Sequence, residues 1–185
     1  MKEASRWQRP VEMKEATRRA GRLALISRLD HVAIATADTG VPLSFYRGTL
    51  GLRASSPKIV SDEEVMVTFV KVPGSRIEIL EPTSDTSPIA RFIRERGGGL
   101  HHFCFEVVDL EEALSKLKEA GVELIDEQPR PGRSGERIAF IHPRSTHHVL
   151  IELAERRPSV QKGREGDRTG PDKGGGSHTR EEQRG

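Results

Sequence analysis

Two similar stretches of the 185-residue sequence decide the fold: LDHVAIA at residues 29–35 and LHHFCFE at residues 100–106. Each is a short apolar run typical of a β-strand, and each is followed by an aspartate and then by a helical pattern. Self-similarity of this kind indicates that one structural unit occurs twice. We therefore expect two related halves that share a single core.

The helices can be placed from their end signals. Asp109, with a glutamate three residues later, forms a capping box for a helix over residues 110–120, and Asp38 begins a weaker helix that stops near residue 51. A third, short helix begins at Ser87 and Pro88, which are favoured cap and first-turn residues, and ends at three consecutive glycines. This short helix is predicted to join the two halves.

Each half then offers three further strand-like segments. They are predicted at residues 52–60, 65–72 and 76–81 in the first half, and at residues 122–126, 137–141 and 149–153 in the second. Each half therefore has the order βαβββ, and a half of this size could hardly bury its sheet alone. The predicted fold is α+β, with two paired βαβββ modules that form a curved mixed sheet around a cleft.

The chain divides into a central domain and two polar ends. We predict a polar N-terminal extension at 1–28, one domain at 29–155 and a tail at 156–185. The domain contains module one at 29–82, a linker helix at 87–97 and module two at 100–155. The tail is rich in Gly, Arg, Glu, Asp and Ser, a composition that buries too little apolar surface to fold, so we expect it to be disordered.

The composition excludes some classes of partner. The 30 basic and 28 acidic residues leave a net charge of +2, so no strong field favours nucleic acid or a membrane surface. No apolar run approaches the roughly 20 residues needed to span a bilayer. The single cysteine, Cys104, excludes an internal disulfide and suits a reducing compartment, so a cytoplasmic location is expected.

Four residues are predicted to face one cleft. Side chains on a strand alternate between its faces, so the row with Val32 packs under the helix and leaves His31 on the open face. The same pattern puts Glu78, His102 and Glu152 on open faces. Each half thus supplies one histidine from its first strand and one glutamate from its last. If the halves pack about a pseudo-twofold axis, the four side chains meet.

This set of side chains indicates a metal site. Imidazole and carboxylate ligands suit a divalent ion such as Co²⁺, Mn²⁺, Ni²⁺ or Zn²⁺. A single strand histidine is more often hydrogen-bonded than a ligand, and a strand glutamate is usually solvated. The match in residue type and face between the halves is what favours the site. His101 is predicted to lie on the opposite face from His102 and is left out.

The stretch from residue 29 to residue 155 resembles the methylmalonyl-CoA epimerases of the vicinal oxygen chelate superfamily. The matching segments are LDHVAIA (29–35), FYRGTLGL (45–52), RIEILEP (76–82), SPIARFIRERGGGLHHFCFEV (87–107), ERIAFIHPRS (136–145) and VLIEL (149–153). The run from SPIA to GGGLHH and the HPxS…VLIEL ending are specific to this branch. The resemblance implies paired βαβββ modules, an acyl-CoA substrate, a homodimer and a catalytic divalent metal, often cobalt.

The resemblance places His31, Glu78, His102 and Glu152 on the ligand positions of the family, although the Glu78 position is glutamine in some members. It implies interconversion of the (R) and (S) forms of methylmalonyl-CoA, or of a close relative such as ethylmalonyl-CoA, through an enolate that the metal stabilises. Such a reaction ordinarily needs two acid/base groups. Glu152 is the candidate for one. The weaker candidates for the second are Glu106, Glu63 and Glu64.

Some positions depart from the family pattern or stay open. Some relatives have a second glutamate, thought to act as a base, where this sequence has Val67. The loop before VLIEL commonly carries two glycines and here carries His147 and His148, which either narrow the approach of the acyl-CoA or are ordinary exposed loop residues. Arg133 and Arg144 are read either as contacts for the CoA phosphates or as solvated surface arginines.

Alternative functions share the same fold. A glyoxalase I-type lactoylglutathione lyase uses a similar set of histidines and glutamates, so the ligands alone do not separate it from an epimerase. The SPIA…GGGLHH and HPxS segments favour the epimerase. A metal-free small-molecule-binding protein of this superfamily is a second alternative, although such a protein needs no ligand set and this chain keeps all four residues.

Overall fold

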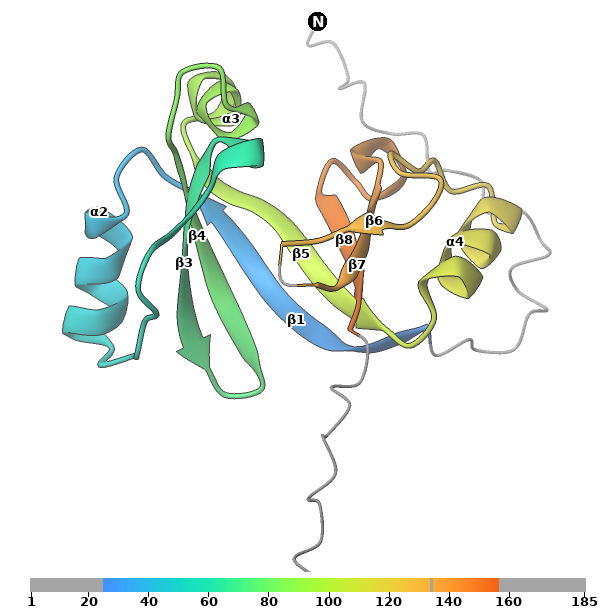
Figure 1. The fold of residues 1–185 in the computed structure, drawn as a ribbon, viewed down its shortest axis with the longest axis horizontal. Coiled ribbons are helices and arrows are strands. Elements are labelled where there is room, and N and C mark those ends of the chain that lie inside the picture. The colour runs from blue at the N-terminus through green and yellow to red at the C-terminus, as the bar shows by residue number, and fades with distance from the viewer. Residues whose placement is uncertain (1–24, 134, 157–185) are drawn as a thin grey trace, which may run out of the picture.

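The computed structural model describes residues 25–133 and 135–156. In this part of the chain eight strands form one mixed sheet with the order β2-β3-β4-β1-β5-β8-β7-β6, which curls into a half-barrel (Figure 1). Most of the predicted N-terminal extension and almost all of the predicted tail lie outside the described residues. The two paired βαβββ modules predicted from the sequence are confirmed.

The elements of the first half, residues 26–82, are β1 (Ile26–Ala35), α2 (Gly40–Leu43), the π-helix η1 (Ser44–Thr49), β2 (Lys58–Val60), the 3-10 helix η2 (Ser61–Glu63), β3 (Val65–Val72) and β4 (Ser75–Pro82). The helix α3 (Pro88–Arg96) joins the halves. The elements of the second half, residues 99–155, are β5 (Gly99–Val107), α4 (Leu110–Glu119), β6 (Arg130–Pro131), β7 (Arg137–Ile141), the 3-10 helix η3 (Pro143–Ser145) and β8 (Leu150–Glu155).

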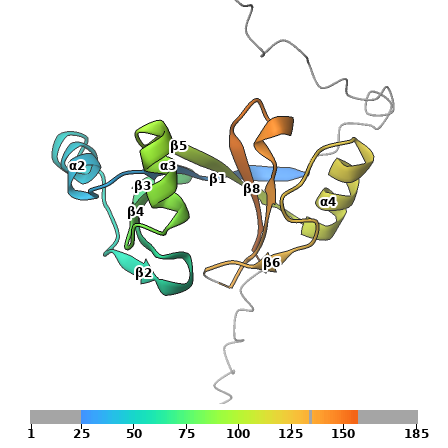
Figure 2. The ribbon, with the colours of Figure 1, turned by 90° about the horizontal axis from the view of Figure 1, so that it is seen from above.

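The two halves meet along their first strands. β1 and β5 pair antiparallel at the centre of the sheet, and each pairs in parallel with the last strand of its own half, β1 with β4 and β5 with β8. The sheet is therefore symmetric about the β1–β5 pair. Figures 1 and 2 show α2 and α4 at opposite ends of the molecule, on either side of this seam.

Two of the three predicted helix starts, at Ser87 and Asp109, are confirmed by their caps. The Ser87 side chain accepts a hydrogen bond from the backbone N–H of Ile89 at the start of α3, and Asp109 accepts from Glu112 at the start of α4. α3 ends at Gly97, which has φ 78°, a left-handed conformation that favours glycine. α3 is thereby fixed in place between the halves.

Among the described residues, every helix is too short or too polar to span a membrane.

Two predicted strands are shorter than expected. Residues 52–60 form a strand only at Lys58–Val60, and residues 122–126 form none, apart from an isolated bridge at Leu124. In the second segment the Asp126 carboxylate accepts the hydrogen bond of the Phe140 backbone N–H at 2.9 Å. A side chain therefore takes the place of a strand carbonyl, and the pairing does not continue. The outer edge of the second half is formed by β6 instead.

The predicted face of the first strand also needs correction. The row of His31 and Ala33 was expected to be open, but Ala33 is fully buried whereas Val32 is only partly buried. Ala33 belongs to a core cluster with Val67 and with Ile89 of α3. The linker helix thus covers the face that the sequence left open, because α2 and η1 contribute no buried residue.

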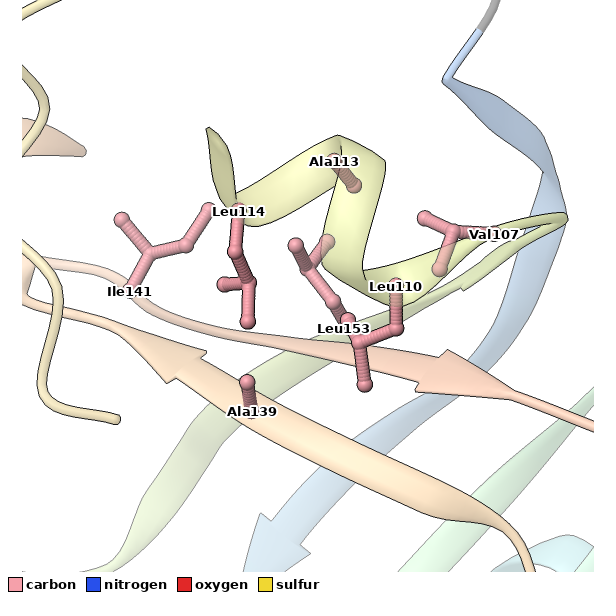
Figure 3. Close-up of a cluster of buried hydrophobic side chains, with 7 residues drawn as sticks. All are labelled: Val107, Leu110, Ala113, Leu114, Ala139, Ile141 and Leu153. Atoms are coloured by element: carbon pink, nitrogen blue, oxygen red, sulfur yellow. The ribbon is translucent and has the colours of Figure 1, made fainter. Parts of the chain in front are cut away.

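The second half packs as predicted. Its main cluster joins α4 to the face of the sheet that points away from His102. The members are Val107, Leu110, Ala113, Leu114, Ala139, Ile141 and Leu153, and Figure 3 shows the side chains of α4 above β7 and β8. This core fixes β5 and β8, the two strands that carry the predicted ligands of this half.

Candidate metal centre

The four predicted ligands converge on one point between the halves. The Nε2 atoms of His31 and His102 lie 3.2 Å apart. Oε2 of Glu78 lies 3.3 Å from Nε2 of His31, and Oε2 of Glu152 lies 3.0 Å from Nε2 of His102. Donor atoms bound to one divalent ion at about 2.1 Å are themselves about 3 Å apart. Each histidine nitrogen lies 3.0–3.7 Å from an oxygen of each glutamate, which is close to this spacing.

The strand register explains this convergence. Ala33 of β1 stands opposite Glu78 on one side and His102 on the other, and Cys104 of β5 stands between His31 and Glu152 in the same way. The ligands therefore form two neighbouring rows across the sheet. The middle residue of each row is small and fully buried. Short side chains at these two positions leave room above them for an ion.

Glu78 carries an orphaned oxygen that a cation would satisfy. Its Oε1 accepts a hydrogen bond from Nη1 of Arg133 at 2.7 Å, but Oε2, although buried, has no hydrogen-bond partner among the described residues. A buried carboxylate oxygen without a partner is costly. This oxygen faces the two imidazoles, and Glu78, His31 and His102 can together offer ligand atoms within 4.8 Å of one another. The residues present fit a divalent metal.

Two β-bulges bring one more residue against each histidine. In the register of β1 and β5, Asp30 is an extra residue on β1 and His101 is an extra residue on β5. A bulge interrupts the alternation of faces and re-aims a side chain. Asp30 Oδ2 consequently lies 2.9 Å from Nδ1 of His31, and His101 Nδ1 lies 2.9 Å from Nδ1 of His102. The prediction that His101 lies on the opposite face from His102, outside the site, is wrong: both histidines line the same cavity.

The electrostatics of the site favour positive charge. Burial lowers the pKa of His31, but its contacts with Asp30, Cys104 and Glu78 outweigh this effect and raise the pKa well above its ordinary value. Burial likewise opposes ionisation of Glu78, yet its contacts with His31 and the charge of Arg133 lower the pKa of Glu78 to about 2. The Glu78 carboxylate therefore stays ionised at neutral pH beside a positive charge on His31.

The pKa of His101, the extra residue of the bulge in β5, is shifted in the opposite direction to that of His31. Burial, reinforced by the charge of His102, lowers the pKa of His101 to about 4, so its ring is neutral at pH 7 and can accept a hydrogen bond. Burial also raises the pKa of the Cys104 thiol to about 11. A protonated thiol is a poor metal ligand, so Cys104 is a packing residue below the site.

A cavity of about 600 Å³ extends from these side chains and is lined by both halves. This size is within the usual range for small-molecule sites, about 300–1,000 Å³. Arg133, between β6 and β7, reaches from the second half to the first, where its Nε donates to Oε2 of Glu63 at 2.7 Å and its Nη1 contacts Glu78. Arg133 is thus a residue of the site, whereas the sequence suggested only a CoA contact or a surface arginine.

The candidate bases are placed unequally. Glu152, Glu63 and Glu64 line the cavity, as does Val67. Glu106 does not line it: its carboxylate pairs with Nη2 of Arg28 at 2.7 Å, further along the β1–β5 seam. Glu106 therefore has no contact with this cavity, and its suggested role as the second base stays a prediction.

The remaining loop residues lie away from the site. Arg144 is largely exposed and pairs with Glu123 at 3.2 Å. His147 and His148 are exposed and have left-handed backbone conformations, with φ angles of 52° and 67°. They hold the conformation for which glycine is preferred, which agrees with the glycines expected at this loop. None of these three residues lines the cavity.

Comparisons with known proteins agree with this geometry. The model of the Glyoxalase/Bleomycin resistance protein/Dioxygenase superfamily matches residues 30–140. The chain is 39% identical over 133 residues to the ethylmalonyl-CoA/methylmalonyl-CoA epimerase of Cereibacter sphaeroides, which covers 71% of this chain and 99% of that protein. The crystal structure of methylmalonyl-CoA epimerase from Mycobacterium tuberculosis has a TM-score of 0.67 at 35% identity, covering 77% of this chain and 96% of that one.

A further solved structure contains a ligand. It is a methylmalonyl-CoA epimerase in complex with methylmalonyl-CoA and NH4+, with a TM-score of 0.64 at 31% identity. The match covers 70% of this chain and 94% of that one. The likeness therefore includes nearly the whole of each of these two solved relatives.

Proposed function

The chain belongs to the methylmalonyl-CoA epimerases of the glyoxalase/bleomycin resistance protein/dioxygenase superfamily, and we propose that it interconverts the (R) and (S) forms of methylmalonyl-CoA or of a close 2-alkylmalonyl-CoA such as ethylmalonyl-CoA. The observation that carries this proposal is the convergence of His31, Glu78, His102 and Glu152 at the floor of a cavity. The relatives that share the fold are epimerases of such thioesters.

We propose that these four side chains hold a divalent metal, for which Co²⁺ is our choice and Mn²⁺, Ni²⁺ and Zn²⁺ also suit the donors. When bound, such an ion supplies Lewis-acid stabilisation of the negative charge that develops on the substrate as its C2 proton is removed. The protein contributes the geometry: both imidazoles and both carboxylates come from neighbouring strands whose register sets their positions.

Glu152 is the proposed base. Its side chain is 11% exposed, more than those of the other three proposed ligands, and it lines the cavity from β8. Epimerisation also requires a proton to return on the opposite face of C2. Val67 offers no acid there, so we assign this role to Glu63, which lines the same wall of the cavity just before β3. Arg133 lies between Glu63 and Glu78 and supplies a positive charge for an anionic substrate.

We also propose an oligomeric state and a cellular location for the enzyme. We expect a homodimer, as the family resemblance suggests. We expect it to act in the cytoplasm, in keeping with a single buried thiol and no described disulfide. Size-exclusion chromatography with light scattering tests the assembly: the expected mass is twice the 20.6 kDa of the chain, and a mass of one chain at micromolar concentration contradicts it.

Exchange of the C2 hydrogen tests the function directly. Purified full-length protein loaded with Co²⁺ is incubated with methylmalonyl-CoA in D2O, and deuterium at C2 is followed by mass spectrometry. We expect exchange that a chelator abolishes and that Glu152→Gln lowers by at least about 100-fold. Glu127→Gln is the matched control, because its side chain is 78% exposed and pairs with Lys118 outside the cavity.

Metal content separates the two roles of Glu152. If Glu152→Gln retains Co²⁺ and loses exchange, the residue acts as a base as well as a ligand. Wild-type exchange that survives complete metal removal contradicts the proposed role of the metal, and no exchange by the Co²⁺-loaded wild type contradicts the proposed function. Turnover of methylglyoxal with glutathione, in place of C2 exchange, would instead indicate a lactoylglutathione lyase.

A further inference from the structure

The residue before each proposed ligand histidine differs between the halves. Asp30 precedes His31, and His101 precedes His102. Both are the extra residue of a β-bulge in the β1–β5 pair, and both place a side-chain atom 2.9 Å from Nδ1 of the following histidine. The Nε2 atoms of the same two histidines face each other across the site at 3.2 Å. Each half therefore contacts the ring nitrogen that points away from the ion.

We propose that His101 is a positioning residue, which accepts a hydrogen bond from Nδ1–H of His102 and thereby leaves Nε2 of His102 free to bind a cation. In a histidine ligand, the partner of the second nitrogen fixes the tautomer and the orientation of the ring. This inference rests on the metal site of the proposed function, but it does not depend on the reaction.

The surroundings of His101 hold its ring in place. Phe92 of α3 packs edge-on against His101, with ring centroids 4.8 Å apart and an interplanar angle of 75°. α3 is itself fixed by the Ser87 cap and by the burial of Ile89 in the core. The linker helix therefore orients His101, and His101 orients His102.

In the first half the equivalent residue is Asp30, and three arginines contact its carboxylate. Asp30 accepts hydrogen bonds from Arg28 at 2.8 Å, from Arg156 at 3.2 Å and from Arg76. A carboxylate acceptor draws the Nδ1 proton more strongly than a neutral imidazole does, and so makes the ring a better electron donor to a metal. We therefore expect His31 to bind the ion more strongly than His102. The duplicated halves would hold one ion with unequal ligands.

The test is the dissociation constant for Co²⁺, measured by competition with a chelating dye on full-length protein without substrate. His101→Leu removes the acceptor, His101→Asn replaces it with an amide oxygen, and His101→Asp copies the first half. We expect the Leu variant to bind about 10- to 100-fold more weakly, the Asn variant to recover most of that loss, and the Asp variant to bind more tightly than wild type.

Matched controls are His147→Leu and His147→Asp, which make the same changes at an exposed position outside the cavity. Both should bind Co²⁺ as wild type does. The visible absorption bands of bound Co²⁺ should shift for His101→Asp and not for His147→Asp, because only the former alters the field at a ligand.

Three results overturn the inference. One is a folded His101→Leu variant, with an unchanged melting temperature, that binds Co²⁺ as tightly as wild type. Another is a loss of affinity in His101→Leu that His101→Asn does not restore, because the defect would then be one of packing. The third is His101→Asp binding no more tightly than wild type. If wild type itself binds no Co²⁺, the proposed function fails, which is distinguishable from these results.

Discussion

The two halves follow the same path, yet their main apolar clusters lie on different faces of the sheet. In the first half the cluster is on the side of His31 and includes Ile89 of the linker helix, whereas α2 and η1 bury nothing. In the second half the cluster joins α4 to the side away from His102. The strand register that sets the ligands is nevertheless the same in both. The site therefore depends on how the strands pair and not on how each helix packs.

The largest expected effect tests the difference in burial between α4 and α2. Leu110 in α4 is fully buried, so Leu110→Ala should lower the free energy of unfolding by about 2–5 kcal/mol. Leu43→Ala, in the partly buried α2, should lower it by less than about 1 kcal/mol. Chemical denaturation of the metal-free protein measures both. Equal losses would show that the first helix packs as firmly as the second.

A second prediction concerns the pH dependence of metal binding, which the first half should dominate. The raised pKa of His31 means that the metal-free protein holds a proton there at neutral pH, and a metal must displace it. Affinity for Co²⁺ should therefore rise by about tenfold, or about 1.4 kcal/mol, for each pH unit between pH 6.5 and 8.5.

The sign follows from linkage. A raised folded-state pKa on His31 stabilises the metal-free fold below pH 6.5, and this contribution is lost as pH rises toward the folded pKa, so alkaline pH favours the metal-bound form. Titration calorimetry at several pH values, in buffers of different ionisation enthalpy, counts the protons released. Release of no proton at pH 7 would contradict a charged His31 in the metal-free site.

The smallest expected effect concerns the turn between the third and fourth strands of each half. The first half uses Gly74, with φ 77°, whereas the second half uses His147, with φ 52°. A left-handed conformation costs a residue with a side chain about 1 kcal/mol more than glycine. His147→Gly should therefore raise the free energy of unfolding by up to about 1 kcal/mol.

His142→Gly is the control for that gain, because His142 has φ −67° and its side chain accepts a hydrogen bond from the backbone N–H of Arg144. It should give no stabilisation. Thermal and urea unfolding of both variants decide the point. A His147→Gly variant that is less stable than wild type would mean that the imidazole makes contacts worth more than the backbone strain.

Much of the fold and the proposed ligand set could be predicted because both depend on local, periodic signals. The caps at Ser87 and Asp109 fixed two helix starts, and the alternation of faces in duplicated strands selected His31 and His102 together with their glutamate partners. These features repeat in the sequence, so each half supports the interpretation of the other.

The features that were missed depend on tertiary contacts. A bulge inserts one residue without a sequence signature, so the strict alternation used for β5 put His101 on the wrong face. The contact of Arg133 with Glu78 spans 55 positions and depends on how the two halves curl toward each other. Burial of Ala33 depends on where the linker helix lies, which its length and caps do not reveal.

The antiparallel seam of β1 and β5 has a consequence for how such a site could arise. One module carries a single imidazole and a single carboxylate, too few to grip a divalent ion. Two identical modules joined along their first strands would already present the full set, because the register is symmetric about that seam. Ion binding thus requires only that two copies of the module pair. Sequence differences between the two copies can then change which substrate binds and how the cavity is shaped without removing the ligands.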